Sequence, residues 1–271
     1  PISNMCNPVL SRTDISDVRA RYVADPFMIR VNDIWYMFFE VLNQAKRRGE
    51  IGLATSTSGL NWKYQRIVLA EPFHISYPYV FEWLGEYYMI PEAWRSGGVK
   101  LYKADKFPDE WSCIGSLIDG NRFADSSILR HEDKWWLFTD SGVNFKSPVL
   151  RLYYSEDLMG PWIEHPVSPI IDNNPHIARP SGRIVSIGGR LIRFTQDVYP
   201  VYGSQVWSFE IQELSLTTYK ERRIYKEPIL SNGNSRWNSG GMHHIDAHQL
   251  ENGKWLACVD GFQWRDPEIN A

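Results

Sequence analysis

Carboxylate side chains recur at matching points along this 271-residue chain, and they are the groups best suited to carry out chemistry. Asp25 and Asp125 each stand just before an apolar run, where an unpaired carboxylate is costly to bury, and Glu92 ends another such run. Two carboxyl groups can cleave a glycosidic bond between them, because one protonates the leaving oxygen and the other activates water or attacks the anomeric carbon. We predict Asp25 as base or nucleophile, Glu92 as acid, and Asp125 as the residue that orients them and holds charge.

A second set of side chains is predicted to bind the substrate. The planar fork of Arg179 suits a carboxylate, which can belong either to a neighbouring unit of the protein or to an anionic substrate. Tyr77 and Trp94 have rings on which a sugar can stack. The predicted substrate-binding residues are Glu40, Tyr77, Trp94, Arg179, Gln196, Asp197, His243, His244, Asp246 and His248.

The histidine-rich segment 242–248 has a metal-binding interpretation and a plainer one. Side chains alternate along a strand, so His244, Asp246 and His248 share one face and His243 takes the other. One face with His, Asp and His could bind a metal ion, and hydrogen bonding to a polar ligand is the alternative. Because no fourth ligand is evident, we predict no cofactor and leave a metal ion at this face open.

Acids at strand ends also have a structural alternative, since they can accept hydrogen bonds from backbone N–H groups of the next unit. This interpretation fits Asp140 and Asp260 best, because a glycine-containing turn sequence follows each of them.

The elements that would position these residues are short runs rich in Val, Ile, Tyr, Phe and Trp, separated by Gly, Asn, Asp and Pro turns, which is the pattern of β-strands. Glu40 follows Asp25 by 15 residues, and Asp140 follows Asp125 by 15. Five runs begin with a polar or Pro-containing step and are each followed by a second run that ends on an acid. The first runs are 25–30, 76–81, 125–130, 179–184 and 244–250, and the second runs are 35–40, 87–92, 135–140, 191–197 and 255–260.

Four strands in about fifty residues is typical of a β-propeller blade. We predict an all-β fold in which residues 1–271 form a single five-bladed β-propeller domain. Third and fourth runs are clear in only four units, and Asn7-Pro-Val-Leu10 resembles Glu227-Pro-Ile-Leu230, so the N-terminal strand is predicted to complete the last blade and cover its edge. The approximate blades are 22–72, 73–120, 121–173, 174–231, and 232–262 plus 6–11.

The innermost strand of each blade lines the central channel, so the polar starts of these strands should converge on one axial pocket. A sandwich built from the same meanders is the alternative fold. It does not explain why a polar position recurs once per unit.

Composition excludes several classes of function. The net charge is −3 and no basic run exceeds Lys46-Arg-Arg48, which argues against nucleic-acid binding. No apolar run approaches the roughly 20 residues of a membrane span, and no signal peptide is visible. The three widely spaced cysteines predict neither a disulfide framework nor a zinc cluster and favour a reducing, cytoplasmic compartment.

The acids of the first and third units resemble those of a known group of enzymes. A five-bladed ring with an acid-Pro step in blade one and another acid in blade three is similar to the glycoside hydrolases of the arabinanase/β-xylosidase and invertase families. The resemblance implies that Asp25, in Ala24-Asp-Pro-Phe27, is the general base or nucleophile. It implies that Asp125, in Phe123-Ala-Asp-Ser126, is the second acid, which stabilises the transition state or tunes a pKa. Those enzymes carry their general-acid Glu in a later blade, where this chain has Arg179, so Glu92 is the predicted replacement.

A closer resemblance covers almost the whole chain and is to the N-terminal domain of plant glucosamine inositol phosphorylceramide transferases and its bacterial relatives. It rests on six phrases in the same order, which are Val23-Ala-Asp-Pro-Phe27, His74-Ile-Ser-Tyr-Pro-Tyr79, Tyr88-Met-Ile-Pro-Glu92, Arg179-Pro-Ser-Gly182, Gln196-Asp197 and Met242-His-His-Ile-Asp246. The resemblance implies a carbohydrate-related role. In the plant proteins, transfer is assigned to a separate glycosyltransferase domain that this sequence lacks.

Two functions therefore compete. The first is a glycoside hydrolase that cleaves an oligosaccharide or glycoside with paired carboxylates in the axial pocket. The alternative is a non-catalytic glycan-binding or accessory module that is fused to, or works with, a glycosyltransferase. A lyase or transferase that uses the same pocket is the remaining alternative.

Overall fold

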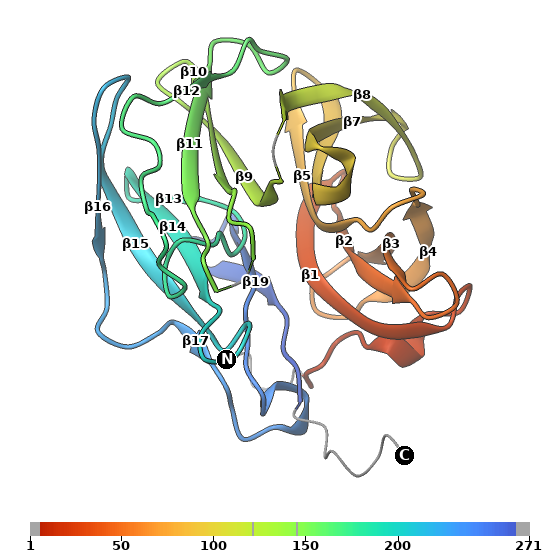
Figure 1. The fold of residues 1–271 in the computed structure, drawn as a ribbon. Coiled ribbons are helices and arrows are strands. Elements are labelled where there is room, and N and C mark those ends of the chain that lie inside the picture. The colour runs from red at the N-terminus through yellow and green to blue at the C-terminus, as the bar shows by residue number, and fades with distance from the viewer. Residues whose placement is uncertain (1–5, 121, 145, 264–271) are drawn as a thin grey trace.

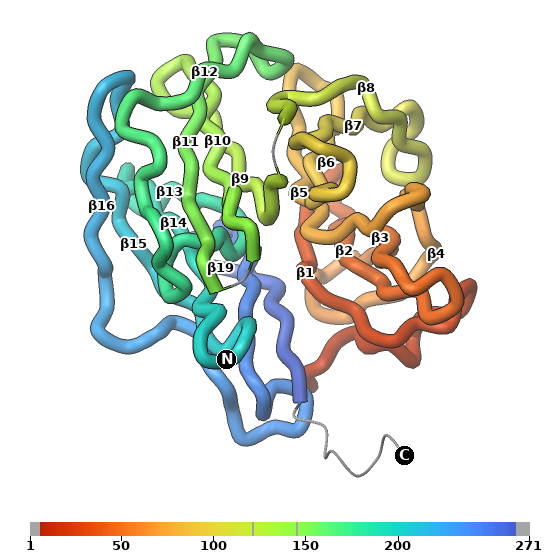
Figure 2. Tube along the Cα trace, viewed as in Figure 1, coloured from red at the N-terminus to blue at the C-terminus, as the bar shows by residue number. Residues whose placement is uncertain are grey.

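The computed structural model describes residues 6–120, 122–144 and 146–263 and consists mainly of antiparallel β-sheets. Figures 1 and 2 show the sheets following one another in chain order around a common centre. The protein is therefore an all-β propeller, as the sequence predicts. Within the described ranges no helix is both long and apolar enough to cross a bilayer.

The first three blades are four-stranded meanders in which each strand pairs with the next. Blade one consists of β1 (Ala20–Val31), β2 (Ile34–Asn43), β3 (Arg48–Ser56) and β4 (Lys63–Leu69). Blade two consists of β5 (Ser76–Trp83), β6 (Glu86–Glu92), β7 (Gly98–Lys106) and β8 (Glu110–Asp119). Blade three consists of β9 (Ala124–His131), β10 (Lys134–Asp140), β11 (Leu150–Ser155) and β12 (Ile163–Glu164).

The rest of the chain forms a fourth blade and a hairpin. Blade four consists of β13 (Val185–Ile187), β14 (Arg190–Asp197), β15 (Gln205–Leu214), β16 (Tyr219–Arg223) and the short β17 (Leu230–Ser231). The hairpin consists of β18 (Ile245–Gln249) and β19 (Trp255–Val259) and lies between blade four and blade one (Figure 1). Three single-turn 3₁₀ helices complete the described elements: η1 (Arg12–Asp14), η2 (Trp94–Ser96) and η3 (Arg236–Asn238).

The prediction of five complete blades is therefore wrong: the described residues form four blades and a two-stranded sheet. The predicted closing strand is also absent from the described part of the N-terminal segment, residues 6–11. Leu10 instead packs its side chain, together with Ile15, into the apolar cluster that blade one shares with Leu256 and Cys258 of β19. The described residues of this segment therefore contribute apolar side chains to this edge and form no strand.

A backbone irregularity repeats at the start of the innermost strands. Asp25, Tyr77 and Asp125 have φ angles of 53°, 47° and 48°, in the left-handed region that costs a non-glycine residue about 1–3 kcal/mol. Each coincides with a shift in strand register in its blade. Bulges of this kind re-aim side chains and are frequent next to active sites. The recurring polar position in the sequence thus corresponds to a recurring bulge in the fold.

The axis beneath these residues is filled by a buried polar and aromatic network. Arg183 Nε donates to Asp246 Oδ1 at 2.8 Å, and its Nη2 donates to the carbonyl oxygen of Val80 at 2.8 Å. The other oxygen of Asp246 accepts the backbone N–H of Met28 at 2.7 Å and lies 2.8 Å from His248 Nε2. These contacts join blades one, two and four to the hairpin at the centre of the ring.

Gly182 forms the joint between blade four and the hairpin, and replacing it by alanine should destabilise the fold. Its φ is 98°, and an added Cβ would overlap the backbone carbonyl oxygen of Ile245. We expect Gly182→Ala to lower the free energy of unfolding by about 2–4 kcal/mol, measured by urea denaturation. Gly85→Ala is the matched control, because φ there is 78° but no atom lies within 4 Å of the added Cβ. Equal losses in the two variants would contradict a steric cause.

Candidate active site

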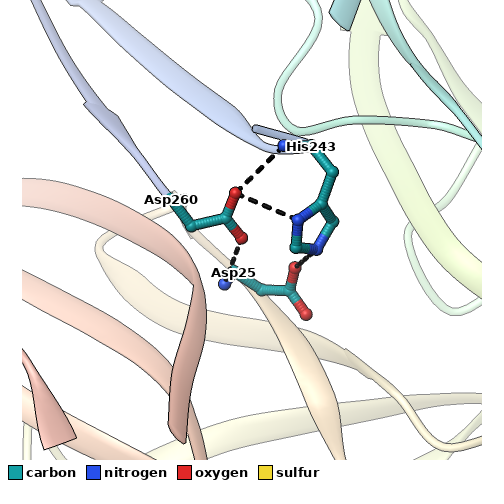
Figure 3. A group of neighbouring side chains, drawn as sticks. All are labelled: Asp25, His243 and Asp260. Carbon is teal, nitrogen blue, oxygen red and sulfur yellow. Dashed lines mark hydrogen bonds and ion pairs between the residues drawn. The ribbon is translucent and has the colours of Figure 1, made fainter. Parts of the chain in front are cut away.

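The site is built around His243, which lies between two carboxylates (Figure 3). Its Nε2 lies 3.2 Å from Asp25 Oδ1, and its Nδ1 lies 3.1 Å from Asp260 Oδ1. Asp260 also accepts the backbone N–H groups of Asp25 at 3.1 Å and of His243 at 3.2 Å. Asp260 therefore has the strand-end role expected from the sequence, and it also orients the imidazole toward Asp25.

Local sequence explains why His243 fits at this position. Gly203 leaves room for it, since an added Cβ there would come within 2.9 Å of the His243 Cβ. The ring of Tyr202 lies beside the imidazole at a centroid distance of 5.5 Å. The side chains of His243 and Asp25 retain only 13% and 11% of their exposure, so both are nearly buried but still reach the surface.

The two carboxylates determine the charge of His243. Burial alone would lower its pKa, but Asp260 and Asp25 raise the pKa of His243 well above its ordinary value. In return, although burial opposes it, the imidazolium holds the pKa of Asp260 well below its usual range. His243 is therefore a cation that bridges two acids.

The charge of His243 predicts how the free energy of unfolding depends on pH. Because the folded-state pKa of His243 lies above the value near 6.5 of an unfolded histidine, its stabilising effect is complete below about pH 6.5 and is lost as the pH rises through the folded-state pKa. We expect the free energy of unfolding to fall by about 1–3 kcal/mol more in the parent than in His243→Gln between pH 6 and pH 10. Urea unfolding of both proteins measures this difference, and parallel pH curves would contradict it.

Glu40, three residues before the end of β2, is a second acid of the site. Its Oε1 accepts a hydrogen bond from Tyr22 Oη at 3.1 Å and lies 3.5 Å from His74 Nε2. His74 Nδ1 accepts the backbone N–H of Gly49 at 2.9 Å, which leaves its proton on Nε2, facing Glu40. Burial, and then the negative charge of Asp25, raise the pKa of Glu40 well above its ordinary value.

Arg179 connects the other predicted acids. Its Nε donates to Asp125 Oδ2 at 2.6 Å, its Nη2 donates to Glu92 Oε2 at 3.2 Å, and its Nη1 lies 3.6 Å from Asp140 Oδ2. Gln196 Nε2 also donates to Asp125 Oδ2, at 2.7 Å. Of the two roles left open for Arg179 in the sequence, the structure shows the one in which it pairs with acids of neighbouring blades.

Burial changes the protonation of these acids despite the arginine. It raises the pKa of Asp125 well above its ordinary value, with Arg179 opposing the change and Glu92 adding to it. It also raises the pKa of Asp140, whose Oδ1 accepts the N–H groups of Gly142 and Val149, both at 2.8 Å. Burial and the Arg179 guanidinium therefore act in opposite directions on the pKa values of Asp125 and Asp140.

Three residues of this region were not predicted as site residues. Tyr22 and His74 contact Glu40, and Tyr202 lies between His243 and the guanidinium of Arg179, which is 5.5 Å from its ring centroid. Tyr22 and Tyr202 are 40% and 39% exposed and form an aromatic rim. The sequence could have indicated two of them, because Tyr22 comes just before Asp25 and His74 comes just before the run 76–81 of the second unit.

Several predicted binding residues have structural positions instead. Tyr77 is fully buried and its hydroxyl accepts the N–H of Gly182 at 2.5 Å. It therefore supports the backbone beneath the site and has no exposed ring face on which a sugar can stack. His244 is also fully buried, with Nε2 2.9 Å from the carbonyl oxygen of Pro26. Asp246 and His248 belong to the network around Arg183, below the site. Asp197 holds the loop that carries Tyr202, through Tyr199 N at 3.1 Å and Gln205 Nε2 at 3.0 Å.

The structure also bears on the metal site that the sequence left open. Asp246 already contacts Arg183, His248 and the Met28 N–H, so a cation at the His244, Asp246 and His248 face would have to displace them. Within the described ranges, the group whose ligand atoms converge is Asp25, His243 and Asp260, all within 4.8 Å of one another. In this structure His243 links those two acids by its own charge.

Comparison with known proteins identifies relatives over nearly the whole chain. Residues 2–262 match the family model described as glucosamine inositolphosphorylceramide transferase 1, N-terminal. The chain is 37% identical over 266 residues to glucosamine inositolphosphorylceramide transferase 1 of Oryza sativa subsp. japonica. That match covers 95% of this chain but 36% of the relative, so the chain spans about a third of the length of the curated relative.

Solved structures with the same fold include glycoside hydrolases. A putative glycoside hydrolase from Parabacteroides distasonis superposes with a TM-score of 0.73 at 11% identity, covering 97% of this chain and 93% of the other. The catalytic domain of a family 62 α-L-arabinofuranosidase from Coprinopsis cinerea gives 0.71 at 12% identity, covering 90% and 86%. At such identities the likeness shows the propeller fold alone.

Proposed function

This chain belongs to the family of the N-terminal domain of glucosamine inositolphosphorylceramide transferase 1, and on that premise we propose that its axial site cleaves a glycosidic bond. The supporting observation is that two carboxyl groups of the site have different neighbours, since Asp25 Oδ1 lies 3.2 Å from His243 Nε2 and Glu40 Oε1 accepts a hydrogen bond from Tyr22 Oη at 3.1 Å. Asp25 is paired with the His243 cation, whereas burial and the charge of Asp25 raise the pKa of Glu40. An acid and a base or nucleophile on the two sides of a glycosidic bond are what hydrolysis requires.

Asp25 keeps the role predicted from the sequence, that of base or nucleophile. His243 and Asp260 orient its carboxylate, and the bulge at Asp25 turns it toward the axis. The relative is named glucosamine inositolphosphorylceramide transferase 1, and the sugar in that name is in keeping with a carbohydrate ligand. The rings of Tyr22 and Tyr202 on the rim provide the flat surfaces on which a sugar can stack.

The proton donor in this proposal is Glu40, and this differs from the sequence prediction of Glu92. Glu92 Oε2 accepts a hydrogen bond from Arg179 Nη2 at 3.2 Å, so the guanidinium already occupies this oxygen. Glu40 has Tyr22 and neutral His74 as neighbours, and burial lowers the pKa of His74. Glu92, Asp125 and Arg179 then form a rigid wall of the site.

Two glutamine variants should separate these roles. We expect Glu40→Gln to lower kcat/KM by about 10²–10⁴-fold on a glycoside with a poor leaving group and much less on an aryl glycoside, which needs little protonation to depart. Glu92→Gln should lower kcat/KM on both substrates by a similar factor, since it alters the wall rather than the proton transfer. Steady-state kinetics on the two substrates measure the difference. The opposite pattern would restore Glu92 as the acid.

The proposed function itself is tested by proton NMR of the parent with a broad panel of oligosaccharides and aryl glycosides. Release of a sugar supports hydrolysis, and the first anomer formed shows whether configuration is inverted or retained. Sugar signals that broaden without any product would contradict hydrolysis. They would favour recognition instead.

That second candidate, a glycan-binding module, has an observation of its own in its favour. Arg179 donates hydrogen bonds to two of the three acids first predicted to be catalytic, Glu92 and Asp125. The chain also spans about a third of a relative named as a transferase, so a partnership with a transferase domain is part of this candidate. In a binding module, Glu40→Gln would change the affinity for the sugar, and there would be no rate of hydrolysis to change.

A further inference from the structure

We infer that the open hollow beside η2 binds the negatively charged group of an acidic sugar, either a carboxylate or a phosphate. The inference rests on the proposed function in one respect: the uncharged part of the same ligand would lie at the axial site. The hollow has a volume of about 670 Å³, within the usual range of small-molecule sites. Its lining residues are Trp94, Arg95, Gly97, Gly120 and Arg122.

Two arginines meet at one indole in this hollow. The Cζ of Arg122 lies 4.3 Å from the ring centroid of Trp94, and the Cζ of Arg95 lies 5.0 Å from it. Each cation is attracted to the face of the indole, while the two guanidinium groups repel one another. An anion bound between them would remove that repulsion.

The protein supplies no such anion in the parts of the chain that the structure describes. Neither Arg95 nor Arg122 has a carboxylate within ion-pair distance there, although most of the other buried or rim arginines do. Asp119, next to Gly120, pairs with Lys100 at 3.8 Å instead. Arg122 is anchored by one bond, from Nη1 to the carbonyl oxygen of Val143 at 2.9 Å, which leaves most of its five N–H donors for a ligand.

The hollow is close to the axial site along the chain, because Trp94 starts η2 just after β6 and Arg122 comes just before β9. Trp94 follows Glu92 by two residues, and Arg122 precedes Asp125 by three, so each is within a few backbone steps of about 3.8 Å from a site acid. The charge of Arg95 also reaches the site: after burial, and against the charge of Asp25, it contributes to the lowered pKa of His74. The hollow is therefore near Glu92 and Asp125, the two acids to which Arg179 donates hydrogen bonds.

The geometry selects an anionic group over a neutral sugar ring. Guanidinium groups already lie against the indole of Trp94, so the ring is a scaffold for the two cations rather than the stacking platform that the sequence predicts. Planar guanidinium groups bind carboxylate and phosphate oxygens through paired, charge-assisted hydrogen bonds. A neutral hydroxyl group gains much less from the same donors.

The test is a titration of the whole ¹⁵N-labelled chain, followed at the indole N–H signal of Trp94, which Trp94→Phe identifies. The probes are glucose, glucuronate, glucose 6-phosphate and inorganic phosphate, all at one ionic strength. We expect the signal to shift saturably with at least one of the two acidic sugars and not with glucose. In Arg95→Gln/Arg122→Gln the affinity should fall at least about tenfold, a loss of about 1.4 kcal/mol. Arg66→Gln is the matched control, because Arg66 lines a different surface hollow and pairs with Asp109 at 2.6 Å.

Each outcome supports or overturns the inference whether or not the protein cleaves a glycoside. A preference for glucuronate or for the two phosphates identifies the group as carboxylate or phosphate. No shift with any anion, an equal shift with glucose, or unchanged affinity in the double variant would overturn the inference. Anion binding without turnover of any glycoside would contradict the proposed hydrolysis and leave the inference intact.

Discussion

Asp25→Asn is expected to lower kcat/KM by about 10²–10⁴-fold while changing KM little, because it removes the base or nucleophile and keeps the shape of the site. Asparagine tolerates the left-handed backbone at this position, where φ is 53°, so the fold should be retained. The bond from the Asp25 backbone N–H to Asp260 is also unaffected by the change. Initial rates on any glycoside that the parent cleaves provide the measurement.

The control for this variant is Asp133→Asn, which makes the same change at a residue with φ of 59° and a fully exposed side chain. It should leave the rate within a factor of about two. The proposed role of Asp25 would be contradicted if thermal denaturation shows that Asp25→Asn is folded and the variant keeps kcat/KM within about threefold of the parent.

Arg183→Met is expected to lower the free energy of unfolding by about 3–5 kcal/mol, which is the usual effect of leaving one partner of a buried ion pair behind. Asp246 is fully buried, and its Oδ1 receives the Arg183 guanidinium at 2.8 Å. The same guanidinium lies 4.6 Å from the ring centroid of Tyr79 and bonds to the Val80 carbonyl oxygen, so blade two also loses a contact. Urea denaturation measures the loss.

Two comparisons make this prediction specific. The double variant Arg183→Met/Asp246→Leu should be more stable than Arg183→Met, because no buried charge is left unpaired. Arg222→Met breaks an exposed pair with Glu210 and should cost less than about 1 kcal/mol. A double variant that is less stable than Arg183→Met would show that packing around the pair, not the unpaired charge, determines the loss.

The Asp246 pair also has a defined pH dependence. Although burial opposes it, Arg183 holds the pKa of Asp246 well below its ordinary value. Its stabilising effect is therefore complete above the unfolded-state value near 3.9 and is lost as the pH falls below it. We expect the stability difference between parent and Arg183→Met to shrink between pH 5 and pH 2, and a constant difference across this range would contradict the assignment.

The repeated architecture could be predicted from the sequence because every blade follows the same pattern. The apolar runs, the polar starts and the acids at strand ends recur since each innermost strand faces the same axis. The closure of the ring could not be predicted in this way. Asn7-Pro-Val-Leu10 resembles a strand, but Leu10 gains its burial by packing beside Ile15, with no ladder hydrogen bonds.

The candidate site shows the same division. Alternation along the strand separates His243 from Asp246 and His248, and the structure agrees that they have different surroundings. Strand alternation alone does not predict which of these side chains faces the site, because that depends on how the hairpin tilts against blades one and four. Glu40 was predicted only as a binding residue, since its raised pKa arises from burial and from the charge of Asp25, which is distant in sequence.

The most direct test of the central claim is a crystal structure of Asp25→Asn with a glycoside that the parent cleaves. The account predicts that the glycosidic oxygen lies within hydrogen-bond reach of the Glu40 carboxyl group, about 2.6–3.2 Å, with the anomeric carbon facing Asn in place of Asp25. A ligand that contacts this site through its hydroxyl groups alone, with its glycosidic bond away from both residues, would contradict the account.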